Sequence, residues 1–155
     1  MASLGQSLAA IRGGALFFPK GVVMLDGQPI KKMTGIFPGA LVQTLEGSGA
    51  IVLPNTSAVI AANSQVGYNS GVFDLWCGVL TVAGNAGSSV RASAVTVFPA
   101  SREPGKFHVA RLDGTLHVIA VTGALWINTG GRSNQLLQPG LAASFPDSSG
   151  CKAGN

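Results

Sequence analysis

The chain has 155 residues, which is enough for one domain with a sizeable hydrophobic core. Hydrophobic residues make up 46% of it, charged residues only 10%, and the mean hydropathy is +0.40. No run approaches the ~18 unbroken apolar residues of a membrane-spanning helix. The net charge of +4 comes from ten scattered Lys and Arg residues, without the basic stripe and interleaved aromatics of nucleic-acid-binding proteins. The composition therefore argues against a membrane span and against nucleic-acid binding.

The N-terminal stretch 1–18 is too apolar for a free tail, since Arg12 is its only charged residue. Ser3 and Gln6 resemble a capping box, which predicts a short helix over Ser3–Arg12. The large apolar side chains of the stretch are Leu4, Leu8, Ile11, Leu16, Phe17 and Phe18. Two interpretations are open. Residues 1–18 form an arm that docks on a neighbouring copy, or Phe17 and Phe18 begin the first strand and pack on their own core.

Two Asp-Gly pairs predict β-hairpins with two-residue turns, at Asp26-Gly27 and at Asp113-Gly114. In the first hairpin, Pro29 cannot donate a ladder hydrogen bond and Lys31-Lys32 discourage unwanted pairing, so its second strand is expected at a sheet edge. In the second hairpin, the turn sets a register in which Leu112 faces Thr115, Ala110 faces His117 and His108 faces Ile119. One face then contains the predicted core residues, namely Phe107, Val109, Leu116, Val118 and Ala120.

Between and after these hairpins, short runs rich in β-branched residues alternate with turn residues. Four such runs lie within Thr34–Tyr68, and further strands are expected over 72–76, 78–82, 90–98, 123–127 and 135–145. The sequence therefore predicts an all-β domain, an antiparallel β-sandwich or β-roll of many short strands. A β-solenoid is the alternative, although the runs show no fixed period.

Residues that carry catalytic or metal chemistry are few. Of six carboxylates, only Asp74 lies within a predicted strand, where it is expected on the polar face. His108 and His117 share a face as diagonal neighbours, but no third metal ligand is evident. Trp76 and Trp126 are expected in the core. The sequence thus predicts no enzyme activity, no metal and no cofactor.

The central stretch also resembles a known family, the FecR-type domain. The resemblance rests on Pro38-Gly39, Val42, Thr44, Gly47-Ser48, Ala50, Val52-Leu53-Pro54, Ser57, Val59 and Asn63-Ser64, and downstream on Gly123–Ile127 and Leu136–Gly140. It covers roughly Gly21 to Phe145 and departs from the family at Ala40, where an acidic residue is common. The resemblance implies a bacterial β-domain, either the periplasmic part of a sensor that relays a signal to a sigma factor or a small secreted protein.

With this resemblance, the chain is divided into an N-terminal arm at 1–18, a FecR-like β-domain at 19–147 and a C-terminal tail at 148–155. A secreted location, with a signal peptide removed before Met1, is the expectation, and the periplasm is the alternative. Cys77 and Cys151 are either free thiols or one disulfide, and the secreted context favours the disulfide. The disulfide would tie the polar tail to a strand.

The low charge, the apolar arm and the many strand edges together predict a structural subunit whose partners are copies of itself, assembled into an extracellular filament or tube. The rival hypothesis is a FecR-like sensory or ligand-binding module that works with a membrane-bound signalling protein.

Overall fold

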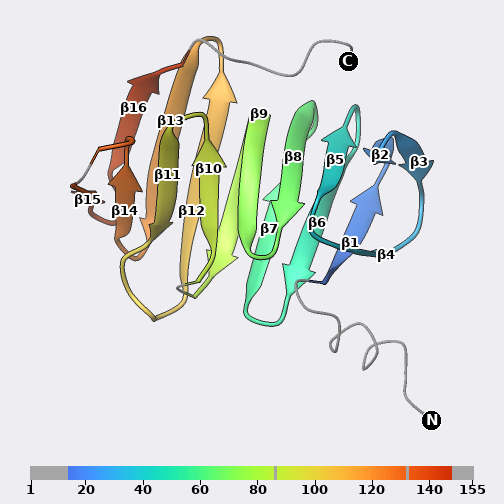
Figure 1. The fold of residues 1–155 in the computed structure, drawn as a ribbon, viewed down its shortest axis with the longest axis horizontal. Helices are drawn as coiled ribbons and strands as arrows, with labels where there is room; N and C mark the ends of the chain where they lie inside the picture. Colours follow the sequence, from blue (N-terminus) through green and yellow to red (C-terminus); the bar gives the residue numbers. More distant parts are fainter. Residues whose placement is uncertain (1–13, 86, 132, 148–155) are drawn as a thin grey trace.

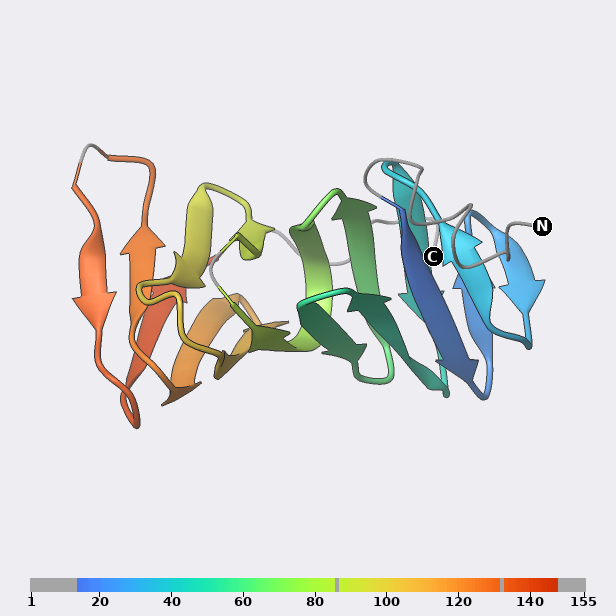
Figure 2. The ribbon, with the colours of Figure 1, turned by 90° about the horizontal axis from the view of Figure 1, so that it is seen from below.

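The computed structural model describes residues 14–85, 87–131 and 133–147, and all regular structure within them is β-strand. This confirms the predicted all-β fold. The strands form a large mixed sheet that folds over into two layers and does not close into a barrel (Figures 1 and 2). The helix predicted over Ser3–Arg12 falls outside the described residues.

Layer A is fully antiparallel. Its strands are, in spatial order, β4 (Thr34–Ile36), β1 (Ala15–Lys20), β6 (Ser48–Leu53), β7 (Thr56–Ile60), the second half of β9 (Val72–Gly84), β12 (Gly105–Leu112), β13 (Thr115–Thr122) and β16 (Ala142–Pro146).

Layer B contains one parallel step, between β9 and β10, while the other strand pairs described in this layer are antiparallel. Its strands are, in spatial order, β3 (Gln28–Ile30), β2 (Val23–Leu25), β5 (Ala40–Thr44), β8 (Ser64–Asn69), the first half of β9, β10 (Ser89–Ala92), β11 (Val95–Pro99), β14 (Leu125–Asn128) and β15 (Gln135–Leu137).

Strand β9 belongs to both layers and connects them. Its first half pairs with β8, and its second half pairs with β7 and β12. The change of layer occurs at Gly78, whose φ of +93° is rarely adopted by other residues, and a Cβ there would lie 2.0 Å from the Ser64 hydroxyl oxygen. The same hydroxyl accepts a hydrogen bond from the Val79 N–H at 3.1 Å. The sequence analysis expected two strands here, over 72–76 and 78–82, whereas β9 is continuous.

The core lies between the two layers and is built by alternation along the strands. Its largest buried side chains include Phe17, Tyr68, Phe73 and Phe107, which come from both layers. The predicted register of the hairpin β12–β13 is confirmed, and its five predicted core residues are all buried. Both Asp-Gly turns are also confirmed, with positive φ at both residues of each turn.

The structure corrects the boundary of the predicted N-terminal arm. Residues 15–18 belong to β1, which pairs with β4 and β6 of the same chain. Phe17 is fully buried in the chain's own core, because it points inward from β1, whereas Phe18 points outward and is 43% exposed. The rest of the arm, with Leu4, Leu8 and Ile11, lies outside the described residues, so the arm itself stays a prediction.

Candidate assembly surfaces

Among the described strands, the open edges of the two layers lie at the two ends of the long axis of the molecule (Figure 1). At the N-terminal end, β4 is the edge of layer A and β3 the edge of layer B. At the C-terminal end, the corresponding edges are β16 and β15. The prediction that the second strand of the first hairpin lies at an edge is therefore confirmed, since β3 pairs with β2 alone among the described strands.

The N-terminal end is basic and carries exposed apolar side chains. Lys31 and Lys32 are exposed in the connection between β3 and β4. Met33 follows them and is 53% exposed, and Phe37 after β4 is 42% exposed. Pro29 removes one donor from β3. Such lysines and prolines are common at edges that must not pair indiscriminately.

Within residues 133–147, the C-terminal end carries no exposed charged side chain. In the stretch 133–147 the only charged residue is Asp147, whose side chain is buried. Leu136 and Leu141 are large exposed apolar residues of this end. Strand β16 presents small residues, Ala142 and Ser144, on its outer face. The two ends therefore differ in charge, but both expose apolar surface.

The outer face of layer A is broad and nearly free of charge. One row of cross-strand neighbours runs across all of its strands except β4, and it consists of Phe18, Ala50, Val59, Thr81, His108, Ile119 and Ala142. Three of these side chains, Phe18, Val59 and Ile119, are at least 40% exposed. The outward-pointing side chains of the second hairpin, β12–β13, are thus one part of a wider surface.

The two histidines share this face, as the predicted register required, and each has a hydroxyl partner. Nδ1 of His108 lies 2.7 Å from Oγ1 of Thr81, and Nδ1 of His117 lies 3.0 Å from Oγ of Ser144. Among the described residues there is no group of three or more His, Cys, Asp or Glu side chains placed to hold a metal ion. These contacts are those of a hydrogen-bonded sheet surface.

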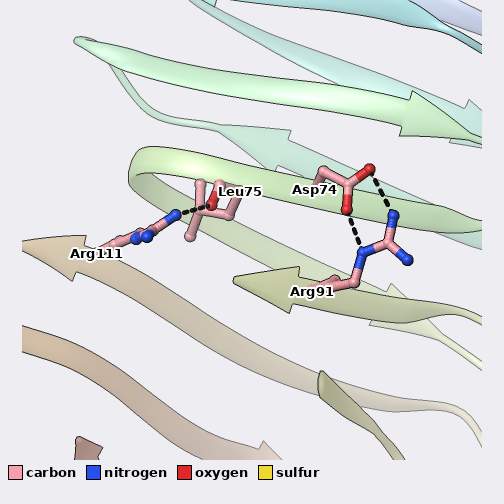
Figure 3. Close-up of polar contacts among 4 residues, drawn as sticks. All are labelled: Asp74, Leu75, Arg91 and Arg111. Carbon is pink, nitrogen blue, oxygen red and sulfur yellow. Dashed lines mark hydrogen bonds and ion pairs between the residues drawn. The ribbon is translucent and has the colours of Figure 1, made fainter. Parts of the chain in front are cut away.

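An ion pair that the sequence did not reveal is buried between the layers. Arg111 points inward from β12 and donates two hydrogen bonds to the carboxylate of Asp147, from Nε and, at 3.0 Å, from Nη2. Its Nη1 donates to the carbonyl oxygen of Leu75 at 3.0 Å (Figure 3). The side chains are 4% and 5% exposed. Asp147 is the last residue of the predicted β-domain, and it anchors the end of β16 to β12 and, through Arg111, to layer B.

A second ion pair lies on the outer face of layer B. Asp74 on β9 and Arg91 on β10 are neighbours in register, and their two hydrogen bonds measure 2.7 and 3.1 Å (Figure 3). The hydrogen bond to Asp74, and then its negative charge, raise the pKa of Arg91 above its usual value. Asp74 is on the outward face of its strand, as predicted.

Both tryptophans correct the sequence analysis, which placed them in the core. Trp76 points outward from β9 and is 36% exposed, and Trp126 is half-buried on the outer face of β14 beside Phe98. Each lies between two inward-pointing neighbours, so alternation directs it to the outer face. Cys77 is buried in β9. Its predicted partner Cys151 lies outside the described residues, so the disulfide stays a prediction.

A pocket of about 270 Å³ opens between the layers near the ends of β11, β14 and β16. Its wall includes Ala92, Ala94, Val95, Leu116 and Phe145, with Asp147 at one side. In the part of the chain that the structure covers, no helix is long and apolar enough to cross a membrane. The geometry thus offers strand edges, a face with little charge and a pocket lined by both apolar and polar residues.

The fold defines the class of protein as a two-layered all-β domain with a strand shared between the layers. Comparison with known proteins adds no relative, because no family profile, curated protein or solved structure matches the chain.

Proposed function

We propose that the protein is a non-enzymatic, secreted structural subunit that assembles with copies of itself into an extracellular filament or tube. The observation that carries the proposal is the pair of open edges at opposite ends of an elongated sandwich, each flanked by exposed apolar side chains. An open edge is a template for pairing with another chain, and the outer face of layer A adds little charge to keep copies apart. The segment 1–13 joins at Gly14, directly before edge-proximal β1, and remains our candidate arm.

The experiment is a concentration series of the purified protein, followed by light scattering and electron microscopy. Leu141→Lys places a charge at the C-terminal end, where Leu141 is 55% exposed, and is expected to abolish assembly. Leu112→Lys is the matched control, because Leu112 is 46% exposed at the end of β12, which β13 separates from the edge strand β16. A wild-type protein that stays monomeric at all concentrations would contradict the proposal. A version lacking residues 1–13 tests the arm separately.

The pocket between the layers favours a second candidate, a ligand-binding module that works with a membrane-bound signalling protein. Its volume suits a small apolar group rather than a typical metabolite, since ligand pockets usually measure about 300–1,000 Å³. An apolar fluorescent dye that binds the monomer at one site, and no longer binds after Ala94→Trp, would support this candidate over the first.

A further inference from the structure

We propose that copies join head to tail, with β16 of one copy pairing antiparallel with β4 of the next. This inference rests on the proposed function, self-assembly, and specifies which surfaces meet and in which direction. It follows from the direction of the edge strands, from the backbone groups that face each open edge, and from the charge of the two ends.

In layer A, strand direction suits a simple translation along the long axis. The layer has eight strands and every neighbouring pair is antiparallel, so its edge strands β4 and β16 run in opposite directions. A second copy shifted along the axis therefore places its β4 antiparallel to β16 of the first. The antiparallel pattern of the layer would continue across the junction without interruption.

In layer B the two edge strands also run in opposite directions, but for a different reason. It has nine strands, and strict alternation would leave β3 and β15 running in the same direction. The parallel step between β9 and β10 reverses the second half of the layer, so that β3 and β15 also run in opposite directions. The same translation is thus compatible with antiparallel neighbours in both layers, which is a property of the whole fold.

The backbone groups at the β4 edge can be assigned from Pro19. Pro19 lies opposite Gly49 in the β1–β6 ladder but has no N–H to donate. The residues on either side of Pro19 therefore make the hydrogen bonds to β6, and every second residue of β1 faces β4 instead. The N–H groups of Ala15 and Phe17 then face β4, where they pair with Ile36 and Thr34. Between these two, Gly35 directs its N–H and C=O toward the open edge.

The β16 edge is assigned in the same way. The Asp147 N–H donates to Gly114, and the Leu141 carbonyl accepts from Ala120, so alternate residues between them bond to β13. Ala142 and Ser144 therefore direct their backbone groups outward, and Pro146 offers only its carbonyl on that side. In layer B, Pro29 lies at the outward-facing position of β3, so the junction there is expected to contribute packing more than hydrogen bonds.

Charge decides which ends meet. Two N-terminal ends brought together by a two-fold axis would place Lys31 and Lys32 of both copies side by side, and like charges oppose association. The C-terminal end shows no exposed charged side chain within residues 133–147. Pairing of the basic N-terminal end of one copy with the C-terminal end of another avoids this repulsion. The resulting polymer still has one free N-terminal end and one free C-terminal end, to which further copies can add.

Two variants that each block one edge test the direction of assembly. Gly35→Pro removes the outward N–H of β4 and Ala142→Pro that of β16, whereas Gly35→Ala and Ala142→Ser are matched controls that keep it. Near-ultraviolet circular dichroism checks that each variant is folded. Head-to-tail assembly predicts that neither blocked variant assembles alone, that their equimolar mixture forms 1:1 dimers only, and that both controls assemble like the wild type.

Blocked variants that each form homodimers, without dimers specific to the mixture, would overturn the head-to-tail arrangement in favour of two-fold contacts. Unchanged polymers from both blocked variants would overturn strand pairing while leaving self-assembly intact. Only a monomeric wild type would overturn the proposed function itself. These outcomes separate the two proposals.

Charge variants at Ala142 give a second test that does not depend on proline. Ala142 is exposed on β16, so both Glu and Lys are accommodated there. In a head-to-tail junction Ala142→Glu adds a negative charge next to the basic end of the next copy and lowers the critical concentration for assembly, while Ala142→Lys raises it, with the two separated by about two- to tenfold at low ionic strength. If both substitutions raise it equally, like ends meet and the proposal fails.

Discussion

Two arginine–aspartate pairs of this molecule have the same chemistry and different surroundings. Arg111 and Asp147 are almost fully buried between the layers, whereas Arg91 is 51% and Asp74 26% exposed on the outer face of layer B. Water screens the exposed pair and solvates either member when the other is lost. The buried pair has no such solvent, so each charge offsets the cost of burying the other, together with hydrogen bonds such as that from Arg111 to Leu75. Identical contacts should therefore differ strongly in their effect on stability.

The largest expected effect is that of Arg111→Ala. It leaves the Asp147 carboxylate buried without its cation, which costs about 3–5 kcal/mol of the free energy of unfolding. The measurement is urea-induced unfolding followed by tryptophan fluorescence. A loss no larger than that caused by Arg91→Ala would show that burial does not distinguish the two pairs.

Replacing both members of the buried pair should be much less harmful than removing one. In Arg111→Met with Asp147→Leu no unpaired charge remains, and the double variant is expected within about 2 kcal/mol of the wild type. The same urea experiment completes a double-mutant cycle with the two single variants. If the double variant is as unstable as their sum, the pair acts through packing rather than charge.

The pKa of Tyr68 tests whether water is also excluded from the core on the inner side of the exposed pair. Tyr68 packs on Phe73 with ring centroids 6.0 Å apart, and burial raises the pKa of its phenol above the usual 10.0. The fold thus favours the protonated phenol, and this contribution to stability is present below pH 10 and is lost as the pH rises through the folded-state pKa. Because the chain has a single tyrosine, its near-ultraviolet absorbance reports this ionisation directly.

We expect a smaller tyrosinate signal at pH 10 in the folded protein than in urea, where the phenol is half-ionised at that pH. Half-ionisation of the folded protein at pH 10 would mean that water reaches the phenol.

The smallest expected effect is that of Arg91→Ala on the exposed pair. Surface pairs contribute about 0–1 kcal/mol, and salt reduces the contribution further. Unfolding in low and high salt should show a small loss that shrinks with ionic strength, and Asp74→Ala should give a loss of the same size. A loss of more than about 2 kcal/mol in the free energy of unfolding, insensitive to salt, would show that this pair contributes to stability as a buried pair does.

Local chemistry explains what the sequence could predict. The Asp113-Gly114 turn allows few backbone geometries, so it determined the register of β12 and β13, and strict alternation then gave the core residues. Pro29 and the two lysines marked an edge. The same alternation contained a signal that was not used, since Arg111 shares its face with Phe107 and Val109, and a charge on a core face requires a partner.

What the sequence could not supply was long-range. Asp147 lies 36 residues from Arg111, and nothing near it indicates burial. Two strands, 72–76 and 78–82, were expected where β9 is continuous, because the backbone conformation of Gly78 serves a change of layer that only the assembled fold requires. The other edge strands, β4, β15 and β16, could not be predicted, because the order of strands in space does not follow from their order along the chain.

The shared strand β9 has a consequence for the order in which a growing chain can fold. Its partners β7 and β8 precede it, while β10 and β12 follow it, so a nascent chain that has reached Gly84 can complete only one half of the sandwich. At that moment β9 is an exposed edge of both layers. Its first half is the edge of layer B, and its second half is the edge of layer A. The C-terminal half then adds to this edge within the same chain. A chain that stalls once Gly84 has left the ribosome is therefore exposed to capture by a neighbouring chain, and the time until residues 85–112 emerge becomes a determinant of correct folding.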